Sequence, residues 1–369
     1  MNRLYGVFVC LYFGALGRAQ SLYHIQDLGV VPGYRFSYAT GVNDIGDAVG
    51  TSFQGPTSRQ AFRNVGHGPK GLGFPQNSEN PTGGKINNDG EICGQYTDRA
   101  LIESRPFRWS EGLGYQALAR TSGYTPGTAI DINASGTILG SNKRLSDGQT
   151  EMIFWNRDGT SVQVGPPNGT RGVLLFSMND LGQVGCASTT EETRLFPYLW
   201  DPTSGYRELG LMQGLDAGRS VGVNNHSTVA IRGVSNLGDS WTYLWTASGG
   251  HERLFSDDMV GLQAEAINDN DVVVGAGAIN GTHDIRAFVW NRQNTHTRLD
   301  SMLDAASQGW TLEWAYDVNN RGQIVGTGII NGVEHGYLAT PVPEPGSLAV
   351  LGGSLIALLR NRRRRSART

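Results

Sequence analysis

Four acidic residues lie within three positions of an asparagine that recurs along the chain: Asp131, Glu265, Asp269 and Asp317. Carboxylates gathered in pairs hydrolyse glycosides, one acting as acid and the other as base or nucleophile. These four belong to different segments, so their linear spacing does not establish that they meet. They are equally explained as solvated residues of exposed hairpins, and we therefore assign no catalytic residue from the sequence.

The densest acidic patch is the Asn-Asp-Asn-Asp run at residues 268–271, which is the best candidate for a calcium site. Calcium takes six to eight oxygen ligands, and the residue after the recurring asparagine is acidic in only some segments. The seven histidines are scattered along the chain, so no local zinc pair is visible. We expect no bound metal and no cofactor.

Familiar nucleotide and acyl-transfer motifs do not appear in the setting that their chemistry needs. The G-x-S-x-G pattern occurs at residues 218–222 but not as an elbow between a strand and a helix, and there is no P-loop and no G-x-G-x-x-G turn between a strand and a helix. Beyond Cys10 near the N-terminus, the cysteines are Cys93 and Cys186. They fall in non-adjacent repeats, too far apart for a disulfide, so we expect both to be buried and unpaired.

An asparagine-led turn recurs at intervals of 44 to 51 residues. An apolar residue precedes most of these asparagines, a glycine usually comes three positions later, and a Val or Ile pair follows. Asn and Gly tolerate the positive φ angles of tight turns, so each segment predicts a hairpin between two strands. The seven asparagines assigned to these structural turns are Asn43, Asn87, Asn133, Asn179, Asn224, Asn268 and Asn319.

A second marker follows the turns, in the register Arg-Ala-Phe-Val-Trp of residues 286–290. A large apolar residue occupies its third position in all seven units. The tryptophan position departs from the pattern only in the first and last units, as is common for terminal repeats. The tryptophans are Trp109, Trp155, Trp200, Trp245 and Trp290.

A further short strand follows the tryptophan in most units, but the last unit ends without one. Residues 23–29, at the front of the chain, carry the missing copy. Four strands in each unit of about 45 residues predict an all-β, seven-bladed β-propeller whose ring is closed by this N-terminal strand. A β-solenoid is the alternative. In the propeller, the five tryptophans would form a core between the blades.

The composition agrees with a fold of many short strands and turns. Of the 369 residues, 52 are glycine and 17% are charged. Glycine disfavours long helices, because it costs ~1 kcal/mol relative to alanine at a helix-interior site. One short helix is expected at residues 301–306, in an insertion before the last unit, where it would cover one mouth of the ring.

The two ends of the chain differ from its middle. Residues 1–19 have the pattern of a secretory signal peptide, with Arg3 before an apolar run and small residues near Ala19. At the other end, Pro343, Glu344 and Pro345 precede an apolar stretch at residues 346–359. A basic cluster completes the tail, and its main members are Arg360, Arg362, Arg363, Arg364 and Arg365.

This C-terminal order of motif, short transmembrane segment and arginine-rich end resembles the PEP-CTERM sorting signal of bacterial envelope proteins. The resemblance implies export, anchoring in the membrane through the C-terminal segment, and processing by an exosortase-type enzyme. An ordinary membrane anchor without processing is the alternative. We therefore divide the chain into a signal peptide (residues 1–19), a propeller domain (20–341) and a sorting segment (342–369).

The repeats resemble the bacterial extracellular HAF family, named for a His-Ala-Phe tripeptide and carrying an N-D-x-G-x-V-V-G turn. The resemblance covers about residues 22–340 and is strongest at residues 309–326, followed by His335. The family histidine survives only as His335, and the other units hold different residues there. The resemblance implies fold and location but no established activity.

The charge of the middle argues against nucleic acid as a partner. Without the eight arginines and one glutamate of the two ends, 22 of the 30 basic and 32 of the 33 acidic residues remain, and no basic stripe is left for phosphates. We expect a non-catalytic envelope or matrix protein that binds polysaccharide or surface proteins. An extracellular glycosidase or lyase, with its site in the propeller channel, is the alternative.

Overall fold

The computed structural model describes residues 22–342, except residues 56, 190–193 and 295. The predicted signal peptide, the Pro-Glu-Pro motif, the apolar stretch and the arginine cluster lie outside the described residues. Within the described residues, no helix is both long and apolar enough to cross a membrane. The unit Tyr23–Pro341 is compact and almost entirely β.

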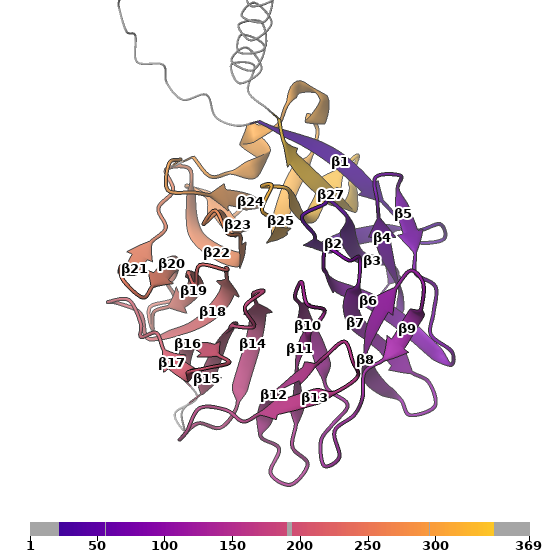
Figure 1. Ribbon diagram of the computed structural model, residues 1–369. Helices are drawn as coiled ribbons and strands as arrows, with labels where there is room; N and C mark the ends of the chain where they lie inside the picture. The colour runs from indigo at the N-terminus through magenta and orange to yellow at the C-terminus, as the bar shows by residue number, and fades with distance from the viewer. Residues whose placement is uncertain (1–21, 56, 190–193, 295, 343–369) are drawn as a thin grey trace, which may run out of the picture. The chain divides into compact units, whose positions relative to one another are not determined.

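Seven antiparallel sheets stand around a central axis as the blades of a propeller (Figure 1). The ring arrangement excludes the alternative solenoid. The innermost strand of each blade ends at a recurring asparagine, and successive blades pack against one another around the ring. Blade 1 comprises β2 (Phe36–Val42), β3 (Ala48–Gly55), β4 (Ser58–Asn64) and β5 (Pro69–Gly71).

Blades 2 to 5 repeat this order from the axis outward. Blade 2 comprises β6 (Ser78–Ile86), β7 (Ile92–Asp98), β8 (Glu103–Ser110) and β9 (Gly114–Ala117). Blade 3 comprises β10 (Thr128–Ile132), β11 (Ile138–Lys143), β12 (Thr150–Trp155) and β13 (Ser161–Val164). Blade 4 comprises β14 (Val173–Met178), β15 (Val184–Thr189), β16 (Leu195–Asp201) and β17 (Gly205–Glu208). Blade 5 comprises β18 (Ala217–Val223), β19 (Val229–Val234), β20 (Ser240–Thr246) and β21 (Gly250–Arg253).

Blade 6 has a shortened outer edge. Its regular strands are β22 (Met259–Ile267), β23 (Val273–Ile279) and β24 (Ile285–Trp290). The fourth position is taken by a single bridge between Phe288 and Arg298 and a hydrogen bond from the Val289 N–H to the Thr297 carbonyl.

Blade 7 joins the two ends of the described chain, as predicted. Strands β25 (Thr311–Val318), β26 (Ile324–Ile330) and β27 (Val333–Pro341) come from the end, and β1 (Tyr23–Gly29) pairs with β27 on the outside. Figure 1 shows β1 beside β27. Hydrogen bonds between first and last strands leave no open seam in the ring.

The predicted helix at residues 301–306 is wrong in form and place. Two 3-10 turns, η1 (Leu299–Met302) and η2 (Ala305–Ser307), stand there instead. The Asp304 N–H donates to the Tyr23 carbonyl, and the Ile25 N–H donates to Ser307 Oγ. The insertion thus packs against the outer strand β1, because the closing strand offers it unpaired backbone groups.

Every inner strand carries a register irregularity two to four residues before its asparagine, for example between Ala39 and Gly41 and between Ala129 and Asp131. A bulge bends a strand and re-aims its side chains. Because the bulges occur at corresponding positions, they repeat the same local geometry around the channel.

Glycines on the second strands make room for the large residues of the third strands. A Cβ on Gly50 would lie 2.1 Å from the Tyr38 carbonyl oxygen and 2.7 Å from the Phe62 ring. Gly50 faces Phe62 across β3 and β4, and Gly94 faces Phe107 in the same way in blade 2. Part of the glycine excess therefore serves packing within blades rather than turns.

Replacing Leu28 with alanine tests the closing strand. Leu28 is 1% exposed and packs with Val325 and Leu338 of blade 7. We expect Leu28→Ala to lower the free energy of unfolding by about 2–5 kcal/mol, measured by denaturant unfolding. Leu113→Ala, at an exposed leucine, is the control and should cost little. An equal effect of the two substitutions would contradict the role of β1 in the core.

Candidate functional site

The asparagine turns share one geometry in all seven blades. In blade 1 the Gly46 N–H donates to the Asn43 carbonyl, and the Asn43 N–H donates to the Asp47 carbonyl. Asn43 Oδ1 accepts the Asp47 N–H. The residue three after the asparagine has a positive φ in every turn, even where it is Ser227 or Asp271 rather than glycine. Each asparagine thus satisfies the buried amides of its own turn.

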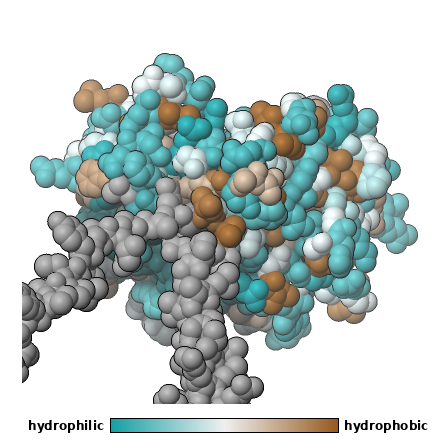
Figure 2. All heavy atoms as spheres, turned by 90° about the horizontal axis from the view of Figure 1, so that it is seen from above, coloured by the Kyte–Doolittle hydropathy of each residue, from teal (hydrophilic) through white to brown (hydrophobic). Residues whose placement is uncertain are grey.

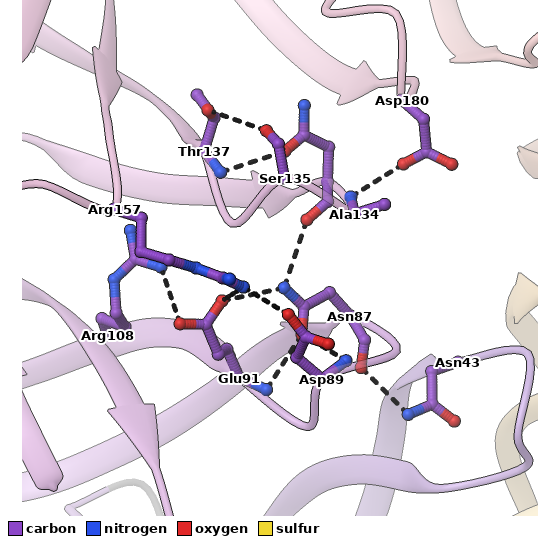
Figure 3. Close-up of polar contacts among 11 residues, drawn as sticks. Asn43, Asn87, Asp89, Glu91, Arg108, Ala134, Ser135, Thr137, Arg157 and Asp180 are labelled. Carbon is purple, nitrogen blue, oxygen red and sulfur yellow. Dashed lines mark hydrogen bonds and ion pairs between the residues drawn. The ribbon is translucent and has the colours of Figure 1, made fainter.

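The side-chain amide of the asparagine also reaches the next blade. Asn43 Nδ2 donates to the Asn87 carbonyl at 2.9 Å, and Asn319 Nδ2 donates to the Asn43 carbonyl at 2.8 Å, which closes the circle (Figure 3 shows Asn43 and Asn87). Four further links have the same form. In the described chain, only the step from Asn133 to Asn179 lacks this bond. We call these seven residues the asparagine ring.

A second ring is formed by the residue that follows each asparagine. Its side chain accepts the backbone N–H of the corresponding residue in the preceding blade. For example, the Asp44 N–H donates to Asn88 Oδ1. The Ala134 N–H donates to Asp180 Oδ1 in the same way (Figure 3). Four other steps repeat it. Ala134 has no side-chain acceptor, so the step from Asn88 to blade 3 is missing.

Carboxylates and amides alternate in this second ring, apart from Ala134. Asp269 Oδ2 lies 3.0 Å from both Asn225 Nδ2 and Asn320 Nδ2. Since like charges at adjacent positions repel, each carboxylate is flanked by residues that carry no charge. The order around the ring is Asp44, Asn88, Ala134, Asp180, Asn225, Asp269 and Asn320.

The run at residues 268–271 is engaged by protein donors rather than left open for a cation. Asp269 accepts hydrogen bonds from the second ring, and Asp271 accepts from Asn224 Nδ2 and pairs with Arg292. Among the described residues, no group of three or more His, Cys, Asp or Glu side chains is arranged to hold a metal. The alternation of the second ring accounts for Asp269, and the contacts with Asn224 and Arg292 account for Asp271.

Beneath the rings, three charged side chains from different blades meet in the channel. Lys85 Nζ lies 3.0 Å from Asp317 Oδ1. Asp317 Oδ2 also accepts the Val42 N–H at 3.0 Å, and Asp131 Oδ2 accepts the Met178 N–H at 2.8 Å. All three charged residues stand two positions before an asparagine of the ring. The two aspartates thus make the same bond to the next blade at two places in the propeller.

The surroundings shift the pKa values of this cluster. Burial raises the pKa of Asp131 to about 6, although Lys85 and the hydrogen bond from Met178 act in the opposite direction. Burial lowers the pKa of Lys85, but Asp317 and Asp131 outweigh it, so the net shift is upward. Lys85 therefore stays charged, while Asp131 titrates near pH 6.

A second charged group lies around Glu265. Arg232 Nη1 approaches Glu265 Oε1 at 3.4 Å, and the Arg219 guanidinium lies 5.1 Å from the centre of the Phe176 ring. Burial raises the pKa of Glu265, against the lowering effect of the two arginines. Sequence reasoning singled out Glu265 but missed Arg232, Arg219 and Lys85. These basic residues lie in other repeat units than the carboxylates that they contact or influence, so linear spacing does not link them.

The structure brings all four acidic residues singled out in the sequence to one cavity. This cavity, of about 200 Å³, lies at the asparagine end of the channel. Asp131, Glu265, Asp269 and Asp317 line it together with six of the seven turn asparagines. Asp131, Asp269 and Asp317 already accept backbone N–H groups from neighbouring blades.

The remaining residues singled out in the sequence lie away from this cavity. Trp155 is buried in a cluster that also holds Cys93 of the preceding blade, and Trp290 is buried with Leu244 of blade 5. Trp109 and Trp245 are buried, and Trp200 is half-buried. As predicted, Cys93 and Cys186 are buried and unpaired.

Three of the histidines have identifiable partners. His24 lies 2.9 Å from Asp304 and His335 lies 3.0 Å from Asp27, both on the outer side of blade 7. His251 contacts the Leu209 carbonyl. The histidine of the His-Gly-Tyr segment thus pairs with the closing strand rather than lining the channel cavity.

Comparison with known families identifies the C-terminal segment. A model of the PEP-CTERM protein-sorting motif matches residues 341–365. The chain carries a PEP-CTERM sorting signal. This signal indicates an exported protein that is anchored in the membrane before an exosortase processes it. No curated protein matches the chain.

Solved structures resemble the propeller in fold alone. Acylaminoacyl peptidase from Pyrococcus horikoshii is 11% identical with a TM-score of 0.52; the match covers 86% of this chain and 54% of the peptidase. The chain therefore matches about half the length of that protein. Virginiamycin B lyase from Staphylococcus aureus is 15% identical with a TM-score of 0.49, and the match covers 87% of this chain and 100% of the lyase.

Completing the second ring should stabilise the propeller. In Ala134→Asn the new amide oxygen can accept the Asn88 N–H, as Asn88 itself does for Asp44. One added hydrogen bond contributes about 0.5–1.5 kcal/mol, so we expect a higher free energy of unfolding by that amount. Ala134→Val, which adds bulk without an acceptor, is the control. A gain of the same size in both variants would contradict the proposed contact.

The raised pKa of Asp131 should make stability depend on pH. The folded protein binds the proton more tightly than the unfolded chain, so this contribution is full below about pH 4 and is lost as pH rises through about 6. Asp131→Asn removes the titration. The free energy of unfolding of the wild type should therefore fall by up to about 3 kcal/mol relative to the variant across that window. A constant difference would show that Asp131 titrates normally.

Proposed function

We propose that this protein is a non-catalytic binding or structural component of the bacterial cell envelope or extracellular matrix. The proposal rests on one observation, which is that the carboxylates in the channel are engaged in contacts between blades. Asp131 and Asp317 each accept a backbone N–H from the next blade, and Asp317 also pairs with Lys85. These contacts hold blades together, as the two asparagine-turn rings do.

The shape of the channel cavity supports this assignment. Its volume of about 200 Å³ lies below the ~300–1,000 Å³ typical of small-molecule sites. A glycosidase places two carboxylates on either side of a bond to be broken, whereas Asp131 and Asp317 occupy the same repeat position and make the same contact. Repetition of one contact is expected of a scaffold.

An extracellular glycosidase or lyase is the second candidate, and one observation favours it. Asp131 has a pKa of about 6 and lies beside Lys85 in a concave site. A carboxyl group with such a pKa can serve as a general acid or base near neutral pH. The two candidates therefore differ in whether Asp131 acts on a bound sugar or only on the next blade.

The two end segments of the chain are the basis for the proposed cellular location and the proposed processing enzyme. We propose that residues 1–19 are a signal peptide removed near Ala19, and that an exosortase-type enzyme then processes the membrane-anchored protein at the cell surface. Extracellular polysaccharide or other surface proteins are the proposed partners. Four of the seven turns read N-[DN]-x-G, at Asn43, Asn87, Asn179 and Asn319, and from this resemblance we propose that the repeats are of the HAF kind.

Binding without turnover is the expected behaviour of the purified protein. It would be incubated with the polysaccharide of the producing cells, and both bound protein and newly formed reducing or unsaturated ends would be measured. We expect retention on the polysaccharide, no product, and equal retention for Asp131→Asn. Product formed by the wild type but not by Asp131→Asn would establish the enzyme instead.

The sorting proposal makes a separate prediction. Replacing Pro343, Glu344 and Pro345 together with alanine should leave unprocessed protein in the cell envelope, because the exosortase would no longer recognise its motif. Processing would be followed by the size of the protein in membrane and surface fractions. Replacing Pro202, an exposed proline of the propeller outside the matched segment, serves as the control. Unchanged processing of the triple variant would refute this role of the motif.

A further inference from the structure

A larger cavity lies at the opposite end of the blades from the asparagine rings. It has a volume of about 580 Å³ and lies between blades 5 and 6. Its walls come from the start of β20, the segment after β21 and the start of β22, and these are the strand ends that point away from the turns. This volume is within the ~300–1,000 Å³ range of small-molecule sites. We call it the Trp241 cavity.

Three side chains form a stacked platform in the Trp241 cavity. The guanidinium carbon of Arg253 lies 3.9 Å from the centre of the Trp241 ring and 5.3 Å from the centre of the Phe255 ring. Trp241 is half-buried, whereas Phe255 is 65% exposed. The exposed ring of Phe255, beside the stacked Arg253 and Trp241, is therefore an apolar surface available to a ligand.

The polar groups of the cavity offer both donors and acceptors. Within the described residues, no carboxylate lies at ion-pair distance from Arg253, so its in-plane N–H groups can donate outward. Asp239 lies at the exposed rim and can accept hydrogen bonds. A ligand with hydroxyl groups satisfies both kinds of partner.

These features select one ligand class. A pyranose ring has a face of C–H groups that packs on an aromatic ring, and an edge of hydroxyls that both donate and accept. The Arg253 guanidinium would attract the carboxylate of an acidic sugar, but the Asp239 carboxylate at the rim and the excess of 32 acidic over 22 basic residues in the domain oppose its binding. We infer that the Trp241 cavity binds a neutral hexopyranose unit of a polysaccharide, an inference that rests on the proposed binding function.

The test uses the full chain and a panel of defined oligosaccharides. Titration calorimetry would compare gluco-, manno- and galacto-hexaoses, all neutral, with a hexauronate. We expect a neutral hexaose to bind, and Phe255→Ala to weaken that binding about tenfold or more through loss of the stacking surface. Phe255→Tyr, which keeps the ring, should retain the affinity. Arg253→Gln should also weaken binding, through loss of the guanidinium donors.

Phe74→Ala is the matched control, since Phe74 is similarly exposed in blade 1, and it should leave the affinity unchanged. Equal binding by the wild type and Phe255→Ala, binding of the hexauronate alone, or no binding of any neutral hexaose would overturn the site. The proposed function is judged separately, by retention on whole polysaccharide. If Phe255→Ala is still retained on whole polysaccharide, the proposed binding function is supported but the Trp241 cavity is not its binding site.

Discussion

The propeller depends on one interaction, in which a buried asparagine side chain satisfies the backbone of two blades at once. Its oxygen accepts an N–H of its own turn, and in six of seven cases its nitrogen donates to the corresponding carbonyl of the next blade. Unpaired buried backbone groups are costly. No other side chain of this size carries both an acceptor and a donor of fixed geometry, so asparagine recurs at all seven positions.

The rest of the channel follows from the closure that these bonds impose. Once the inner strands are held in one register, residues at equal distance from each asparagine meet around the axis. The alternating Asp and Asn side chains can then bridge neighbours without placing two carboxylates side by side, and Lys85 can reach Asp317. The charges at this end are thus used for assembly. At the opposite end, blades 5 and 6 leave Phe255 exposed.

Most of the architecture was predictable because it repeats. The number of blades was predicted from the turn asparagines and the third-strand aromatic residues. The closure of the ring was predicted from residues 23–29, which carry at the N-terminus the strand that the last unit lacks. Contacts made once were not predictable: Lys85 with Asp317 joins blades 2 and 7, and nothing in linear spacing links them. The helix expected at residues 301–306 failed because the backbone of β1, which lies about 280 residues earlier, forms its hydrogen bonds there.

A comparison of two turn asparagines tests this account most directly. Asn43 and Asn133 are both buried and both accept an N–H of their own turn, but only Asn43 donates to the next blade. Denaturant unfolding of Asn43→Ala and Asn133→Ala therefore separates the link between blades from the turn itself. The account predicts that Asn43→Ala lowers the free energy of unfolding by about 1–3 kcal/mol more than Asn133→Ala. Equal losses of unfolding free energy in the two variants would contradict the account, because the asparagines would then stabilise only their own turns and not the contacts between blades.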